Sequence, residues 1–137
     1  MLILRRTMLI AGSALLTAAG APKITWLVFF DWDRTDLNAR GRQLIADAAQ
    51  RMSRDPDIFA DTRVHVDGHT DNSGNVPYDN EVSVKRAQAV AFELVRLGLP
   101  RSVLSIRGHG SSQPLVPTPP SVREQQNRRV EIWAGDA

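Results

Sequence analysis

The chain contains four short segments with the apolar pattern of strands and two longer segments with the pattern of amphipathic helices. Strands are predicted at 24–31, 62–68, 104–107 and 128–133, and helices at 39–52 and 80–97. The first strand is apolar throughout, which favours a central position covered on both faces. The second strand alternates, which favours a half-buried strand with one polar face. Asn38 is positioned to cap the first helix, and Gly98 to end the second.

The order of these elements is β-α-β-α-β-β, and it constrains how they pack. Crossover connections between parallel strands of one sheet are right-handed. Helices that connect strands in this way cover a face of the sheet and bury their apolar sides against it. The sequence therefore predicts an α+β fold, a two-layer sandwich in which both helices pack on one face of a mixed four-stranded sheet.

The first twenty residues have the composition of a targeting segment rather than of a folded domain. Arg5 and Arg6 precede an apolar run at 7–19, and small residues follow the run. This layout is typical of a secretory signal, and the run is short for a transmembrane span. We predict a signal peptide at 1–20 and one domain at 21–137. The alternative is that the segment stays uncleaved as an anchor.

Charge and cysteine content narrow the classes of function. The chain has 17 basic and 15 acidic side chains, and residues 1–20 carry two arginines and no acid, so the predicted domain carries 15 of each. A balanced and interleaved charge does not favour nucleic acid as a partner. The absence of cysteine excludes a disulfide, a cysteine zinc site and a lipid-modified cysteine. Membrane association is therefore expected only through the N-terminal segment or through partners.

Three side chains at the end of the second strand could in principle carry chemistry. Asp67, His69 and Asp71 alternate, so a strand would place them on one face, as in a metal site or an acid–base pair. A catalytic metal site needs a further protein ligand and supporting contacts, and the chain has no nucleophile–histidine motif. We expect no enzyme activity, no cofactor and no metal, and His69 is interpreted as a turn residue whose ring bonds to loop backbone. A metal-dependent hydrolase is the alternative.

Asp71 and Arg86 form a second candidate pair, on the strand end and on the following helix. They are fifteen residues apart, across a loop that returns the chain to the same end of the sheet. A structural ion pair would explain this spacing. A ligand site would explain it equally well, because Asp71 could accept from an ammonium group and Arg86 could hold a carboxylate with two parallel hydrogen bonds. Free amides at the start of the helix would assist the carboxylate.

Five motifs in order give the chain a family resemblance. They are VFFDWD at 28–33, GHTD at 68–71, YDNEVSVKRA at 78–87, GHG at 108–110 and NRRVEI at 127–132. Over nearly the whole chain after residue 23, these motifs and their spacings resemble the OmpA-like C-terminal domain, the peptidoglycan-associating module of Gram-negative envelopes. The resemblance includes peptidoglycan-associated lipoprotein, although this chain lacks the lipid-carrying cysteine.

The resemblance implies a function and a set of site residues. Such domains bind peptidoglycan noncovalently, reading the zwitterionic diaminopimelate of the stem peptide, and tether envelope components to the wall in the periplasm, beside the outer membrane. Peptidoglycan and other envelope proteins are the implied partners. A stator-type or secretion-type anchor, held in the inner membrane by residues 1–20, is the alternative. The implied ligand-binding residues are Asp71 for the amine, Arg86 for the carboxylate, the backbone at Phe30 and Asp31, and the side chains of Asn80 and Asn127.

Two positions depart from the family pattern. The asparagine that usually follows the tyrosine is Asp79, and the usual leucine is Val82. Asp79 could replace the asparagine as an acceptor that caps the loop. Alternatively, its negative charge could weaken the binding of a ligand carboxylate. Both interpretations leave the roles of Asp71 and Arg86 unchanged.

Overall fold

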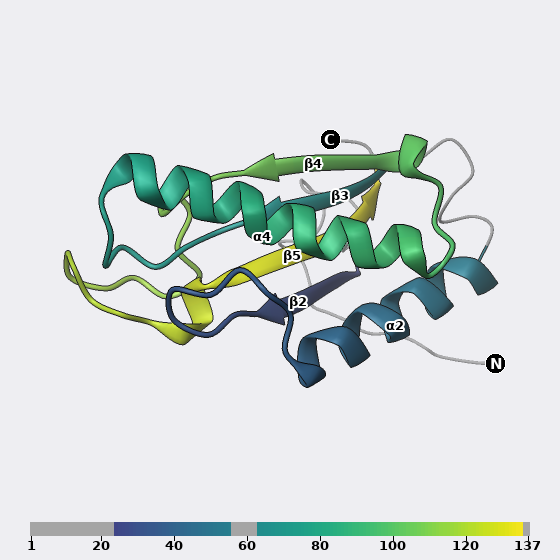
Figure 1. The fold of residues 1–137 in the computed structure, drawn as a ribbon, viewed down its shortest axis with the longest axis horizontal. Coiled ribbons are helices and arrows are strands. Elements are labelled where there is room, and N and C mark those ends of the chain that lie inside the picture. Colours follow the sequence, from purple (N-terminus) through teal and green to yellow (C-terminus); the bar gives the residue numbers. More distant parts are fainter. Residues whose placement is uncertain (1–23, 56–62, 136–137) are drawn as a thin grey trace, which may run out of the picture.

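The computed structural model describes residues 24–55 and 63–135 (Figure 1). The segment 1–20, predicted as a signal peptide or anchor, lies outside the described residues. In chain order the elements are β2 (Thr25–Phe29), α2 (Ala39–Arg54), β3 (Arg63–Gly68), α4 (Val76–Arg96), a 3₁₀ turn (Arg101–Val103), β4 (Leu104–Gly108), a second 3₁₀ turn (Gln125–Asn127) and β5 (Arg129–Gly135). Neither of the helices in the described ranges is long and apolar enough to cross a membrane.

The four strands form one mixed sheet in the order β2-β5-β3-β4. The last strand, β5, lies between β2 and β3 and is antiparallel to both, whereas β3 and β4 are parallel. Figure 1 shows α2 and α4 on the same face of this sheet. The predicted α+β two-layer sandwich is therefore confirmed.

The core lies between the helices and one face of the sheet. Alternate residues of each strand point to this face, so the inner residues of β3 and β5 meet the apolar sides of α2 and α4. The fully buried members include Val28, Val64, Val66, Val130 and Ile132 from the strands and Ile45, Met52, Ala87, Val90 and Leu94 from the helices. The opposite face of the sheet carries the other residues of each strand. Neither α2 nor α4, the helices of the described ranges, covers it, and we call it the helix-free face.

Two predictions about the strands are wrong. The apolar run at 24–31 forms an edge strand, not a central one, and Ile24 is 48% exposed. Of its apolar residues, Val28 and Phe30 are the ones buried in the core. The polar side of β3 is not solvated, because His65 and Asp67 are only 2% and 5% exposed. These residues are buried by polar neighbours on the helix-free face of the sheet.

The second helix also begins earlier than predicted. It starts at Val76 instead of residue 80, because the Asn75 side chain accepts a hydrogen bond of 2.9 Å from the backbone N–H of Tyr78 and caps the helix. Arg86 is therefore ten residues into α4, so the free amides at the helix start do not adjoin it. Val84 is apolar but 38% exposed, so it does not belong to the buried side of α4.

Local signals at the helix ends are confirmed, and close packing positions α4. The Asn38 side chain accepts from the Gly41 N–H at 2.8 Å, and Gly98 ends α4 with a φ of 112°. At Gly68 an added Cβ would overlap the carbonyl oxygen of Ser83. Because glycine allows this approach, α4 lies directly against the end of β3 and carries Arg86 to the loop that follows the strand.

Candidate ligand-binding site

The loops at one end of the sheet form a small pocket against α4. Both Asp71 and Arg86 line it, so the structure brings together the two charges that the sequence singled out. We call it the Asp71–Arg86 pocket. Its lining residues are Trp32, Asp33, Thr70, Asp71, Ser73, Tyr78, Asp79, Val82, Arg86 and Arg128.

Arg86 is buried and holds the loops after β2 and β3 together. Its side chain is 2% exposed. Its guanidinium donates to three carbonyl oxygens, those of Arg34 at 2.9 Å, His69 at 3.2 Å and Asp31 at 3.4 Å, and lies 5.3 Å from the centre of the Phe30 ring. Burial lowers the pKa of Arg86 to about 10, so the group remains a cation at neutral pH. The guanidinium is thus a fixed positive charge at the base of the pocket.

Asp71 is also buried, and its ion-pair partner is Arg128 and not Arg86. One carboxylate oxygen accepts from Arg128 at 2.9 Å and from the Glu124 N–H at 3.0 Å. The other accepts from the Ser73 hydroxyl at 2.6 Å and the Ser73 N–H at 3.2 Å. Burial alone would raise the pKa of Asp71, but the hydrogen bonds from Ser73 and Arg128 outweigh it and the pKa is lowered. Asp71 is therefore an ionised carboxylate.

Arg128 is a pocket residue that the sequence analysis did not select. Its guanidinium donates to the Phe30 carbonyl at 3.0 Å as well as to Asp71, which connects β2 to the loop after β3. Its charge contributes to the lowered pKa of Arg86, after burial. The available signal was its place beside Asn127 in the NRRVEI motif at 127–132, which continues into β5. Two guanidinium groups thus face the carboxylates of this pocket.

The pocket is narrow, and an exposed aromatic side chain, Trp32, is among the residues that line it. Its volume is about 10 Å³, which is about enough for one water molecule. The Trp32 indole N–H donates to the Ser73 hydroxyl at 3.4 Å, and the Arg123 guanidinium lies 3.5 Å from the centre of the Trp32 ring. Trp32 is 45% exposed, so its displacement would uncover the pocket without opening the core.

The pattern of residues that defines the OmpA family matches residues 29–128 of this chain. The chain belongs to the OmpA family. The matched segment runs from the end of β2 to the residue before β5, and it contains every residue that lines the Asp71–Arg86 pocket. The resemblance that the five motifs indicated is therefore confirmed for the family and for the fold.

Named relatives of this OmpA-family chain are envelope proteins. It is 48% identical over 120 residues to an outer membrane protein of Gluconacetobacter diazotrophicus, covering 83% of this chain and 31% of that protein. It is 30% identical to the peptidoglycan-associated lipoprotein of Agrobacterium fabrum, covering 80% of this chain and 60% of that protein. The crystal structure of peptidoglycan-associated lipoprotein from Burkholderia pseudomallei superposes with a TM-score of 0.69 at 25% identity, covering 80% of this chain and 89% of that chain. The chain thus spans less than two thirds of both sequence relatives.

The other predicted site residues of this OmpA-family domain lie around the pocket. The Phe30 N–H donates to the Arg128 carbonyl at 2.9 Å, and the Asp31 carbonyl accepts from Arg86. Asn80 is exposed at the surface of α4 and does not line the pocket. Both ends of the buried Asn127 amide bond to Val116, its Oδ1 accepting and its Nδ2 donating at 2.8 Å. Asn127 therefore anchors the loop before β5.

Asp67, His69 and Asp71 do not share a site in this OmpA-family domain. Asp67 bonds to Arg107 on the helix-free face of the sheet, whereas Asp71 bonds to Arg128 in the Asp71–Arg86 pocket. Within 24–55 and 63–135, no group of three or more histidine, cysteine or acidic side chains is arranged to hold a metal. The geometry therefore does not favour the alternative of a metal-dependent hydrolase, which placed all three side chains on one face.

The expectation for the ring of His69 is wrong. The side chain is 1% exposed, and neither ring nitrogen has a hydrogen-bond partner among the described residues. The ring stacks on His109 with centroids 5.0 Å apart, and Nε2 lies 3.8 Å from a carboxylate oxygen of Glu131. Only the backbone of His69 serves the pocket, through the bond from Arg86 to its carbonyl. Burial is the largest cause that lowers the pKa of His69, to about 4.

Proposed function

We propose that this OmpA-family domain binds peptidoglycan noncovalently through the diaminopimelate of the stem peptide. By this binding it tethers an envelope component to the cell wall, in the periplasm and beside the outer membrane of a Gram-negative bacterium. The observation that carries the proposal is the burial of opposite charges, Asp71 and Arg86, in one pocket of the domain. The names of the relatives, an outer membrane protein and peptidoglycan-associated lipoproteins, support the location and the polymer.

Asp71 is the acceptor for the ammonium group of the ligand. A carboxylate has about four acceptor positions, and Ser73, Glu124 and Arg128 fill them with four hydrogen bonds. An ammonium group therefore binds by replacing one of these donors. Replacement of Arg128 keeps the charge of Asp71 balanced and frees a guanidinium for a carboxylate of the peptide. Binding and a local rearrangement of the pocket are coupled in this scheme.

Arg86 holds the carboxylate on the same carbon as the ammonium group. A guanidinium has five N–H donors, and three hydrogen bonds fix Arg86 to backbone carbonyls. The remaining donors are held in place by those bonds, so little side-chain entropy is lost when they bind a carboxylate. A zwitterionic carbon carrying both groups matches Asp71 and Arg86 better than either charge alone. Free diaminopimelate should compete for the site better than cadaverine, which has the two ammonium groups but no carboxylate.

Cosedimentation with isolated sacculi tests the role of Asp71. The variant Asp71→Asn keeps the shape of the side chain but removes its charge, and we expect binding at least about tenfold weaker, because a charge-assisted hydrogen bond contributes about 1.5–3 kcal/mol. The matched control is Asp47→Asn, at an exposed position of α2, which should bind like the wild type. If Asp71→Asn pelleted with sacculi as much as the wild type does, the Asp71–Arg86 pocket would not be the site that binds peptidoglycan.

Asp79 is expected to oppose the binding of the ligand carboxylate. It is 3% exposed and lines the pocket, and burial is the largest of the causes that raise its pKa. Asp79→Asn removes the charge and should strengthen binding to sacculi by about two- to fivefold at pH 7, since it abolishes a repulsion of about 0.5–1 kcal/mol.

The dependence on pH checks the same interpretation of Asp79. As the pH falls toward its raised pKa, an increasing fraction of this carboxyl takes up a proton and the repulsion weakens. Wild-type binding should therefore strengthen from pH 7 to pH 5, whereas binding by Asp79→Asn should change less over that range. Weaker binding by Asp79→Asn at pH 7 would show instead that the carboxylate accepts from the ligand.

A further inference from the structure

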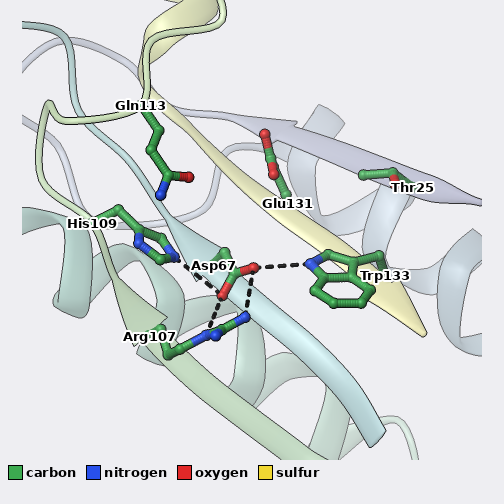
Figure 2. Close-up of a pocket in the computed structure, with 7 residues that line it drawn as sticks. All are labelled: Thr25, Asp67, Arg107, His109, Gln113, Glu131 and Trp133. Carbon is green, nitrogen blue, oxygen red and sulfur yellow. Dashed lines mark hydrogen bonds and ion pairs between the residues drawn. The ribbon is translucent and has the colours of Figure 1, made fainter. Parts of the chain in front are cut away.

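A second pocket lies on the helix-free face of the sheet, outside the Asp71–Arg86 pocket (Figure 2). Its volume is about 420 Å³, within the range of pockets that hold small molecules. We call it the sheet-face basin. Its lining residues are Thr25, Asp67, Arg107, His109, Gln113, Glu131 and Trp133. All four strands and the loop after β4 contribute to it.

The strand register explains why these residues meet. Asp67 on β3 pairs with Arg107 on β4 and with Glu131 on β5, so the three side chains lie in one row across the sheet. Two residues along, Trp133 pairs with Thr25 on β2 and with His65 on β3. Residues two apart on a strand share a face. The floor of the basin is therefore two adjacent rows of polar and aromatic side chains.

Asp67 is the internal anchor of the basin. Its carboxylate is 5% exposed and accepts from Arg107 at 3.0 Å and from the Trp133 indole N–H at 2.9 Å, and it lies 3.4 Å from Nε2 of His109. Figure 2 shows these three side chains converging on it. Their orientation is therefore fixed without a ligand, which lowers the entropy lost on binding.

One wall of the basin is the flat ring of Trp133, which stacks on the buried ring of His65. The rings of His65 and Trp133 stack with centroids 3.9 Å apart and an interplanar angle of 16°. The indole N–H of Trp133 is used by Asp67, so its ring is held in place. Aromatic rings of this kind present an apolar surface with a polar edge. A ligand that fits here has one apolar face.

Other groups around the basin retain unused hydrogen-bonding capacity. One carboxylate oxygen of Glu131 accepts from Arg129 at 2.8 Å, whereas the other lies 3.8 Å from the nearest ring nitrogen of His69, beyond hydrogen-bond distance. The Gln113 side chain makes no hydrogen bond to the part of the chain that the structure describes, and only its backbone carbonyl is used, by Arg129. An amide and a carboxylate oxygen together offer the donor and acceptors that hydroxyl groups need.

Charge excludes several other kinds of ligand for the basin. Asp67 is balanced by Arg107 and Glu131 by Arg129, so no net charge recruits a phosphate or a polyanion. The described residues contain no metal-binding group of three or more histidine, cysteine or acidic side chains. The remaining match is an uncharged ring with hydroxyl groups on its rim and an apolar face, which is the chemistry of a sugar.

We propose that the sheet-face basin binds a sugar ring of the glycan strand of peptidoglycan. This inference rests on the proposed function, because the glycan strand and the stem peptide belong to the same polymer. The two sites are joined by β3 and the loop after it, since Asp67 lies in the basin and Asp71, four residues later, in the other pocket. Two weak contacts to one polymer increase the overall affinity of the domain for it, because the second contact forms within a complex that already exists.

A stem-free glycan tests the basin separately from the peptide. The probe is chitotetraose, the tetramer of N-acetylglucosamine, which contains no diaminopimelate and so does not need Asp71. We expect its addition to shift the NMR signals of the Trp133 indole N–H and the Gln113 side-chain amide, with a Kd of about 1–10 mM. Gln113→Ala should weaken this binding at least about threefold. Gln50→Ala, at an exposed position on α2, and Asp71→Asn should leave it unchanged.

The outcomes separate this inference from the proposed function. Absence of shifts at about 10 mM chitotetraose, or shifts confined to the Asp71–Arg86 pocket, would overturn the sugar site while sacculi still pelleted with the wild type. Wild-type chitotetraose affinity in Gln113→Ala would also overturn it. If chitotetraose bound at the basin but sacculi pelleted equally with Asp71→Asn, the sugar site would stand and the peptide pocket would fail.

Discussion

Replacement of Arg86 by alanine is expected to lower the free energy of unfolding by about 3–5 kcal/mol and to abolish binding to sacculi. The stability effect follows from the 2% exposure of Arg86 and from its three backbone partners, the carbonyls of Arg34, His69 and Asp31. Alanine leaves these acceptors without their donor and opens a cavity over the Phe30 ring. Denaturant unfolding of the variant and the wild type measures the difference.

Arg86→Lys separates folding from ligand binding. Lysine keeps the positive charge and can reach some of the carbonyls, so we expect a smaller loss of stability, about 1–2 kcal/mol. It lacks the planar fork that holds a carboxylate with two bonds, so sacculi binding should still fall by about tenfold. The matched control is Arg40→Ala, an exposed arginine on α2, which should change stability by less than about 0.5 kcal/mol. Wild-type binding by a folded Arg86→Lys variant would show that Arg86 only braces the loops.

Local sequence signals predicted the elements of the fold but not their full extent. The caps at Asn38 and Gly98 were identifiable because each depends on one side chain or one backbone conformation. The start of α4 was not predicted because Gly74, Asn75 and Pro77 have the composition of a turn. Asparagine followed by proline in the first turn is also a helix start. Only the packing of the following residues distinguishes a turn from a helix start.

Long-range pairing decided what the sequence pattern could not predict. The strand 25–29 is an edge strand because it pairs only with β5, which is about a hundred residues later in the chain and lies between it and β3. An apolar run indicates that a strand is buried, but it does not indicate which strands pair with it or whether it lies at the edge of the sheet. The alternation of β3 likewise predicted a polar face correctly, whereas the burial of His65 and Asp67 depends on Trp133 and Arg107 from other strands.

The site was predicted in part for the same reason. Asp71 and Arg86 belong to consecutive elements, so their spacing already indicated that they meet, and they do line one pocket. The partner of Asp71, Arg128, is 57 residues away and lies between the second 3₁₀ turn and β5. Its role depends on β5 lying between β2 and β3, which brings the start of β5 beside the end of β3. Sheet order therefore sets the electrostatics of the pocket.

Acid is expected to destabilise the domain through His69 by about 3 kcal/mol between pH 7 and pH 4. Burial, followed by the charges of Arg129 and His109, lowers the pKa of this histidine to about 4 from an ordinary 6.5, while Asp67 acts in the opposite direction. Glu131 is the other charged group that faces the ring, 3.8 Å from Nε2. Between these two pKa values the unfolded chain binds a proton that the folded chain does not. The free energy of unfolding therefore falls as the pH falls through this window.

His69→Phe removes the titrating group and keeps a flat ring against His109. The pH dependence of its unfolding free energy, measured with denaturant from pH 7 to pH 4, should be smaller than that of the wild type by about 3 kcal/mol. The lowered pKa values of Asp67 and Asp71 add a loss in the same direction, but one that develops mainly below pH 4. Gln50→Ala, a change without a titrating group at an exposed position of α2, is the control and should keep the wild-type slope. Equal slopes for His69→Phe and the wild type would mean that His69 takes up its proton at the same pH in the folded domain as in the unfolded chain.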